Sequence, residues 1–130
     1  MCGIVGLIKR TALTEANEDA VRHLSACIVH RGPDGEGTFA ADGFMMAMRR
    51  LAIIDLAGGW QPLYNEDKSI ALVANGEVYN FIELRKELEA RGHQFRTKSD
   101  CETIIHAYEE YGDACVDKLR GMYAFCIYDS

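Results

Sequence analysis

The chain has 130 residues, a net charge of −6 and 48% hydrophobic residues, which suits one domain with a real core. It contains no long run of Lys and Arg, so nucleic acid is a poor candidate partner. Its apolar runs are far shorter than the ~20 residues that span a bilayer, and no secretory signal pattern opens the chain. We therefore expect neither a membrane protein nor a secreted one.

Five cysteines are an odd number, and none of them forms a CxxC pair. Without a secretory signal, this predicts reduced thiols in a cytoplasmic protein. Four of them are expected to pack in the core or between helices: Cys27, Cys101, Cys115 and Cys126. The four histidines form no HxxxH or His/Cys pair at ligand spacing, so we expect no metal site.

The first predicted strand is Gly3–Ile8, an apolar run that is β-branched and interrupted by glycine. Thr14 is expected to cap the helix that follows. The apolar stripe of this helix repeats at helical spacing over Val21, Leu24 and Ile28. The helix should end before residues 30–35, because one proline and two glycines cannot continue it.

Two or three short strands are expected between residues 38 and 54, with a turn at 42–43. The last of them is predicted at 51–54, directly after Arg50, and the glycines and proline of 57–62 indicate a loop. Residues 70–74 read as another buried strand, which is expected to stop at Asn75-Gly76.

Capping-box spacing predicts two further helices, one after Asn80 with Glu83 and one after Ser99 with Glu102. Gly92 and Gly112 are expected to end them. Residues 122–128 are apolar on both faces, which indicates a buried strand. Because the chain stops two residues later, we expect a truncated domain whose exposed edge would favour self-association.

The N-terminus carries the first chemical signal. If Met1 is removed, the thiol of Cys2 and the new α-amine sit on one carbon. Their reference pKa values are about 8.5 and 7.7–8.0, so near neutral pH the amine can act as base for the thiol. A nucleophile activated in this way needs no histidine. The alternative is that Cys2 is an ordinary buried thiol.

Polar residues at predicted strand and helix ends form a second signal. Arg50 can hold an α-carboxylate bidentately, and Glu77 and Asp100 can hold an α-ammonium group. The Asn75 side chain and the Gly76 N–H can form an oxyanion hole for an attacked amide. Such a set suits a free amino acid with a carboxamide side chain.

Each residue of this set also has a simpler interpretation. Asn75-Gly76 is a strong two-residue turn signal, and Asp100 can stabilise a helix N-terminus. Arg50 can form a surface ion pair worth under about 1 kcal/mol. Residue types and spacing alone leave both interpretations open.

Six motifs occur in order along the chain: MCGIVG at 1–6, HRGPDG at 30–35, RLAIID at 50–55, QPL at 61–63, NGEVYN at 75–80 and SDCE at 99–102. This series resembles the glutaminase domain of glutamine-hydrolysing asparagine synthetases, which are class II, N-terminal-nucleophile glutamine amidotransferases. The likeness covers residues 1–130 as one glutaminase domain, incomplete at its C-terminus. It implies an α+β fold, an Ntn-hydrolase-like sandwich of two mainly antiparallel sheets flanked by helices.

The resemblance also implies roles for single residues. Cys2 would be the nucleophile, Asn75 and Gly76 would form the oxyanion hole, and Arg50, Glu77 and Asp100 would bind the α-groups of L-glutamine. The Ile54 backbone would contact the substrate amine. Arg31 would support these residues without contacting the substrate. Met48 departs from the family, which commonly has histidine at this position.

Further expectations concern parts beyond this chain. In the relatives a C-terminal synthetase domain follows, and ATP and magnesium are expected only there, so this segment needs no cofactor. A homodimer is a further expected partner arrangement. Two alternatives stay open: a catalytically silent fold module, and a glutaminase domain that serves a sugar-phosphate or phosphoribosyl acceptor.

Overall fold

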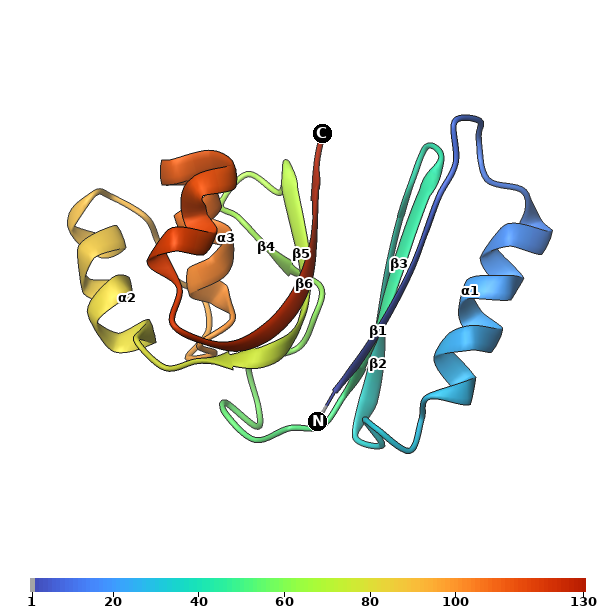
Figure 1. Cartoon of the computed structure of the whole chain (residues 1–130), viewed down its shortest axis with the longest axis horizontal. Helices are drawn as coiled ribbons and strands as arrows, with labels where there is room; N and C mark the ends of the chain where they lie inside the picture. Colours follow the sequence, from blue (N-terminus) through green and yellow to red (C-terminus); the bar gives the residue numbers. More distant parts are fainter. Residues whose placement is uncertain (1) are drawn as a thin grey trace.

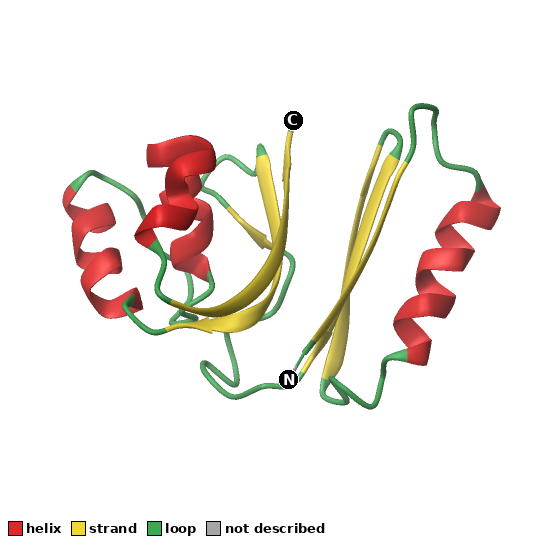
Figure 2. Ribbon diagram, in the orientation of Figure 1, coloured by secondary structure: helices red, strands yellow, loops and turns green. Residues whose placement is uncertain are grey.

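The computed structural model describes residues 2–130, which form two three-stranded sheets with helices on their outer faces. Figure 1 shows the two sheets facing each other, with α1 outside one of them and α2 and α3 outside the other. Along the chain, four consecutive strands separate α1 from α2 and α3, and a last strand, β6, returns to the second sheet (Figure 2). The architecture is therefore α+β, with four layers in the order helix, sheet, sheet, helix.

The first sheet has the order β1-β3-β2 and is antiparallel throughout. Its strands are β1 (Gly3–Ile8), β2 (Gly35–Ala41) and β3 (Phe44–Arg50), and α1 (Glu15–Cys27) covers its outer face. The central strand β3 is buried on both faces. Met45 and Ala47 pack toward Val21 of α1, whereas Met46 and Met48 pack toward the second sheet. This two-sided burial explains why the strand is almost continuously apolar.

The second sheet has the order β4-β5-β6 and is also antiparallel. Its strands are β4 (Leu63–Tyr64), β5 (Ile70–Val78) and β6 (Gly121–Asp129). The helices α2 (Phe81–Ala90) and α3 (Glu102–Tyr111) and the 3₁₀ segment η1 (Gly112–Lys118) cover its outer face. Ala71 and Val73 of β5 meet the methionines of β3 between the sheets, and Leu72 and Ala74 face the helices.

Several sequence predictions are confirmed. Thr14 is the N-cap of α1, and its backbone N–H donates to Asn17 Oδ1 at 3.1 Å. The turn at 42–43 joins β2 to β3. Gly92 follows α2 with a φ of +108°, a conformation that favours glycine. None of the helices in residues 2–130 is long and apolar enough to cross a membrane.

Other predictions are wrong. Residues 51–54 form no strand, because β3 already ends at Arg50 and the chain turns into the loop that joins the sheets. β5 does not stop at Asn75-Gly76 but continues to Val78, paired with β6. Leu24 is 52% exposed, and Ser25 takes its place on the buried face of α1.

The capping boxes of the later helices do not form either. The Asn80 side chain donates to Lys118 O at 2.9 Å and accepts the Arg120 N–H at 2.8 Å, so it fixes the start of β6 instead. Ser99 is not the N-cap of α3, which is Cys101. Glu102 accepts backbone N–H groups from residues 96 and 97. In each case the side chain that spacing assigned to a capping box forms hydrogen bonds outside the helix end instead: Asn80 with the start of β6, and Glu102 with the loop before α3.

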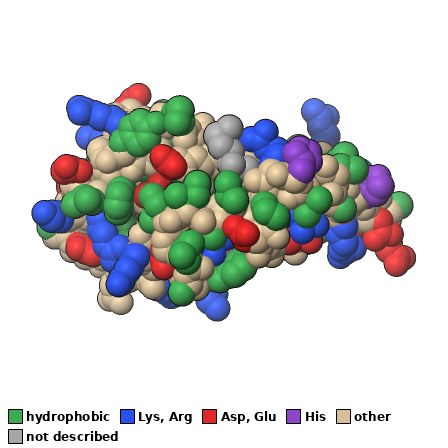
Figure 3. Space-filling model, turned by 90° about the horizontal axis from the view of Figure 1, so that it is seen from below, with side chains coloured by type: hydrophobic (Ala, Val, Ile, Leu, Met, Phe, Trp, Pro, Cys, Tyr) green, Lys and Arg blue, Asp and Glu red, His purple; other side chains and the backbone are tan. Residues whose placement is uncertain are grey.

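The remaining differences concern exposure. Cys27 is exposed, whereas Cys101 and Cys115 are buried and Cys126 is half-buried. Within residues 2–130, β6 is an edge strand with half-buried or exposed side chains, not a buried strand. The face seen from below in Figure 3 carries hydrophobic side chains along its length, with basic and acidic groups interspersed among them.

Candidate functional site

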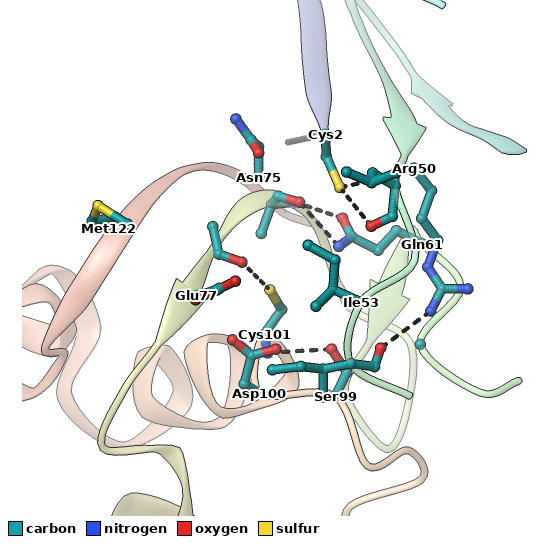
Figure 4. A pocket seen from close by; sticks show the side chains of 15 residues that line it. Cys2, Arg50, Ile53, Gln61, Asn75, Glu77, Ser99, Asp100, Cys101 and Met122 are labelled. Carbon is teal, nitrogen blue, oxygen red and sulfur yellow. Dashed lines mark hydrogen bonds between the residues drawn. The ribbon is translucent and has the colours of Figure 1, made fainter. Parts of the chain in front are cut away.

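All seven predicted site residues line one cavity of about 150 Å³ between the two sheets. They come from the tip of β1, the end of β3 with its following loop, the second half of β5, and the turn before α3. The seven are Cys2, Arg50, Ile54, Asn75, Gly76, Glu77 and Asp100. Figure 4 shows Cys2 entering from β1 next to Asn75, with Glu77 and Asp100 further along the cavity. The fold therefore brings together residues separated by up to 98 positions, the difference between 2 and 100.

The thiol of Cys2 is held by the backbone that follows β3. The Leu51 N–H donates to Cys2 Sγ at 3.2 Å, and Sγ lies 3.5 Å from Leu51 O. An N–H aimed at the sulfur stabilises a thiolate, since hydrogen bonds to a charged acceptor are the stronger ones. Arg31 adds a second restraint, because its Nε donates to Cys2 O at 3.1 Å. Cys2 is thus positioned by the loop after β3 and by the Arg31 side chain.

Alternate backbone groups of β5 point into the cavity. The Ala74 N–H donates to Gln61 Oε1 at 2.6 Å, and the Val78 N–H donates to Asp100 Oδ2 at 2.7 Å. Residues two apart on a strand face the same edge, so the Gly76 N–H points the same way, away from β6. No described residue accepts a hydrogen bond from it there. This N–H and the neighbouring Asn75 side chain are therefore available to a ligand.

Gly76 is a glycine because of close packing, not because of a turn. A Cβ on this residue would lie 2.6 Å from Tyr123 Cα of β6, closer than real Cβ contacts allow. The Asn75-Gly76 pair lies inside a regular antiparallel ladder opposite Ala124 and Tyr123. The turn interpretation of this dipeptide is therefore wrong.

Arg50 is 4% exposed, so it is not a surface ion pair. Its Nη2 donates to Asp55 O at 2.6 Å and lies 3.4 Å from Ile54 O, and its guanidinium stacks 4.8 Å from the centroid of the Trp60 ring. These bonds use only part of its five N–H donors. Arg50 thus shapes the loop after β3 while it lines the cavity.

Asp100 is buried and does not cap α3 through its side chain. One carboxylate oxygen accepts the Val78 N–H, which leaves the other free for a ligand. The adjacent Cys101 also lines the cavity. Burial, together with the charge of Asp100 and of Cys2, raises the pKa of the Cys101 thiol to about 12. Cys101 therefore stays a neutral thiol beside the site.

Sequence reasoning missed the contribution of Gln61. Its amide pairs with both backbone groups of Ala74, at 2.6 and 3.0 Å, as a neighbouring strand would. The segment QPL at 61–63 is one of the six motifs, but nothing in its residue types predicts this contact. Asp34 was missed in the same way: its carboxylate accepts the Ala52 N–H at 2.8 Å and fixes the loop beside Cys2.

Met48 lies in the layer between the sheets and is 1% exposed. It packs in the cluster that also touches Cys2. A thioether at this position fills space in the layer between the sheets. Met48 therefore contributes to packing behind Cys2 and is not among the residues that line the cavity.

Comparisons with known proteins identify the family of the chain. The family described as "Glutamine amidotransferase domain" matches residues 1–130. The chain is 44% identical over 131 residues to asparagine synthetase [glutamine-hydrolyzing] 1 of Bacillus subtilis, covering 99% of this chain and 21% of that protein. It is 47% identical over 130 residues to asparagine synthetase [glutamine-hydrolyzing] 3 of Arabidopsis thaliana, covering 100% of this chain and 22% of that protein. The chain thus spans about a fifth of the length of these relatives.

A solved structure shares the fold. Glutamine phosphoribosylpyrophosphate amidotransferase from B. subtilis superposes with a TM-score of 0.71 at 22% identity, covering 98% of this chain and 35% of that one. The sandwich of two antiparallel sheets is therefore that of the Ntn-hydrolase-like amidotransferases, as the sequence predicts. With this family match over residues 1–130, the chain belongs to the glutamine amidotransferase domain family.

Proposed function

We propose that this domain hydrolyses the side-chain amide of L-glutamine with Cys2 as its nucleophile. The observation that carries the proposal is the arrangement in the cavity. A thiol held by a backbone N–H lies in the same cavity as an unengaged amide side chain, a buried guanidinium and two carboxylates. Acyl transfer needs the first two groups, and recognition of a free amino acid needs the rest.

The chemical step begins with removal of Met1, which lies outside the described residues. The freed α-amine of Cys2 takes the thiol proton, and the thiolate attacks the amide carbon of glutamine. The Asn75 side chain and the Gly76 N–H stabilise the oxyanion of the tetrahedral intermediate. Its C–N bond then breaks, and the protonated amine returns the proton so that ammonia leaves. Water attacks the γ-glutamyl thioester, which releases glutamate and restores the thiol.

Substrate recognition rests on opposite charges at the far end of the cavity. Arg50 binds the α-carboxylate through the N–H groups that the loop carbonyls do not use. The free oxygen of Asp100 and the carboxylate of Glu77 bind the α-ammonium group, and the Ile54 carbonyl adds an acceptor. This arrangement rejects amines and carboxylic acids that carry only one of the two charges.

The molecule that accepts the ammonia would bind outside this domain. We infer a C-terminal synthetase domain that uses ATP and magnesium to form asparagine, as a cytoplasmic ligase. The identity of 44–47% to asparagine synthetases supports this acceptor over a phosphoribosyl one, because the likeness to the phosphoribosylpyrophosphate enzyme is in fold alone. The open edge of β6 provides a surface for that domain or for a second copy of the chain.

The test measures glutamate release from L-glutamine by the chain after mass spectrometry has confirmed loss of Met1. We expect turnover, together with covalent labelling of Cys2 by a glutamine-analogue electrophile. The Cys2→Ala variant should lose both while its circular dichroism stays unchanged. Turnover retained in Cys2→Ala would show that the nucleophile is wrong. A processed, folded chain that neither turns over nor labels would favour a silent module.

A further inference from the structure

A second group of reactive side chains converges in the helical layer of the second sheet. Glu66 lies in the turn between β4 and β5, His93 follows α2, and His106 and Glu109 lie one turn apart on α3. One nitrogen or oxygen atom of each residue lies within 4.8 Å of those of the other three. None of these residues lines the Cys2 cavity. We call this group the α3 cluster.

The distances within the α3 cluster match those around a small metal ion. His93 Nδ1 lies 3.4 Å from Glu109 Oε2 and 3.6 Å from Glu66 Oε1. His106 Nδ1 lies 2.8 Å from Glu109 Oε2 and 3.7 Å from Glu66 Oε2. Nitrogen and oxygen ligands of tetrahedral zinc lie about 2.0–2.2 Å from the ion, which puts them roughly 3.3 Å from one another. The four measured separations scatter around that value.

The outward-facing nitrogen of each histidine meets a carboxylate. His93 Nε2 lies 3.1 Å from Glu110 Oε1, and His106 Nε2 lies 3.8 Å from Glu102 Oε1. Metal-binding histidines typically direct their second ring nitrogen to such a group, which fixes the ring and the tautomer. Both Nδ1 atoms are thereby turned toward the centre of the cluster.

The two carboxylates are also oriented from outside. Glu109 Oε1 accepts a hydrogen bond from Asn65 Nδ2 at 2.9 Å, and Oε2 faces the histidines. Glu66 Oε1 accepts the Gln94 N–H at 2.8 Å, which leaves Oε2 without a hydrogen-bond partner in the described chain. Glu109 thus presents one oxygen inward and is held through the other, whereas Glu66 faces His93 with Oε1 and His106 with Oε2.

His106 supplies an independent indication. It is completely buried, and its Nε2 is a buried nitrogen without any hydrogen-bond partner among residues 2–130. A neutral ring that donates from Nδ1 to Glu109 would turn the Nε2 lone pair toward the Glu102 carboxylate, which is repulsive. A metal on Nδ1 places the proton on Nε2, where it points at that carboxylate. Without a metal, the other arrangements are a doubly protonated ring and a neutral ring protonated on Nε2, whose Nδ1 lone pair would face Glu109 Oε2.

The charge balance also favours a cation. Glu66, Glu102, Glu109 and Glu110 surround the two rings, and in the described chain only Arg91 pairs with one of them, Glu110. The Phe95 ring packs 4.5 Å from the His106 ring and keeps one side of the cluster dry. Excess negative charge beside a fully buried imidazole is costly unless a positive charge compensates it.

We propose that Glu66, His93, His106 and Glu109 bind a four-coordinate Zn²⁺ ion. Two imidazoles and two carboxylates are ligands that zinc accepts in tetrahedral sites. Four protein ligands leave no open position, so the site is structural. It joins the β4–β5 turn and the connection after α2 to α3, the helix whose preceding turn carries Asp100. The ligands are spread over residues 66–109, which is why a search for short ligand spacings predicts no metal site.

The experiment titrates the metal-stripped chain with Zn²⁺ alone, in a Cys2→Ala background. That background removes the N-terminal amine and thiol pair, which can itself chelate zinc. We expect one Zn²⁺ per chain and a higher melting temperature with zinc than with EDTA. The variants His93→Gln and Glu66→Gln change partly exposed ligands. They should lower zinc affinity at least tenfold and abolish the shift in melting temperature.

The matched control is His23→Gln, which removes an exposed histidine of α1 and should bind zinc like the parent. No zinc binding by the parent, or binding that survives both ligand variants, would overturn the proposal. If both variants fail to fold, the Co²⁺ spectrum of the parent decides. A four-coordinate spectrum without a thiolate charge-transfer band supports the site, and a thiolate band or a six-coordinate spectrum overturns it.

Discussion

Replacing Asn75 by alanine should separate catalysis from stability. The Asn75 side chain makes no hydrogen bond within residues 2–130 and lines the cavity beside Cys2. Its removal should therefore change the free energy of unfolding by less than about 0.5 kcal/mol. Loss of one oxyanion donor costs about 2.7–4 kcal/mol of transition-state stabilisation, which lowers kcat about 10²–10³-fold. Glutamate release under saturating glutamine, with urea denaturation of the same sample, measures both quantities.

Asn80→Ala is the matched control, because it removes the same side chain from a position outside the cavity. Asn80 makes two hydrogen bonds, to Lys118 O and from the Arg120 N–H. Their loss should cost about 1–2 kcal/mol of stability and leave kcat unchanged. The reasoning is refuted if Asn75→Ala lowers kcat less than tenfold, or if its effect appears in KM alone. The latter would make Asn75 a binding residue that contacts ground state and transition state equally.

Three further predictions follow from the same cavity. Gly76→Ala should lower the free energy of unfolding by about 1–3 kcal/mol, measured by urea denaturation, because the new methyl group overlaps Tyr123 Cα; an unchanged midpoint would contradict this packing. Cys101 should resist alkylation at pH 8 while Cys2 reacts, as peptide mass mapping would detect. Because burial raises the pKa of Cys101 from an ordinary value of about 8.5 to about 12, the contribution of its bound proton to folding stability is fully present below about pH 8.5 and is lost as the pH rises toward 12. Asp100→Asn keeps an oxygen for the Val78 N–H but removes a negative charge, so KM for glutamine should rise at least tenfold with little change in melting temperature; an unchanged KM would remove Asp100 from the binding site.

The interpretation of single side chains from local spacing succeeded or failed for identifiable reasons. The helix expected after Asn80 is present as α2, and it ends before Gly92 as expected. The apolar stripe predicted for α1 placed Leu24 on the buried face, but only Val21 and Ser25 of this helix are buried. With so few buried positions, the sequence does not define the buried face clearly. The capping boxes failed because the Asn80 side chain pairs with residues 118 and 120, and because Glu102 accepts the N–H groups of the loop residues 96 and 97 just before α3. A local motif is only one of several ways to satisfy a polar group.

The sequence by itself determined the family, the α+β class and seven of the residues that line the cavity, because the ordered motifs contain the side chains that can carry chemistry. Only the tertiary structure decided how these residues act on one another. The strand geometry of β5 directs the Gly76 N–H toward the cavity. The Gln61 side chain pairs with the Ala74 backbone as a neighbouring strand would, and the Leu51 N–H in the loop after β3 donates to Cys2 Sγ. The α3 cluster likewise exists only in the fold. The physical reason is that these contacts join residues 13 to 49 positions apart in the chain. Neither residue type nor local spacing indicates which distant segments will meet.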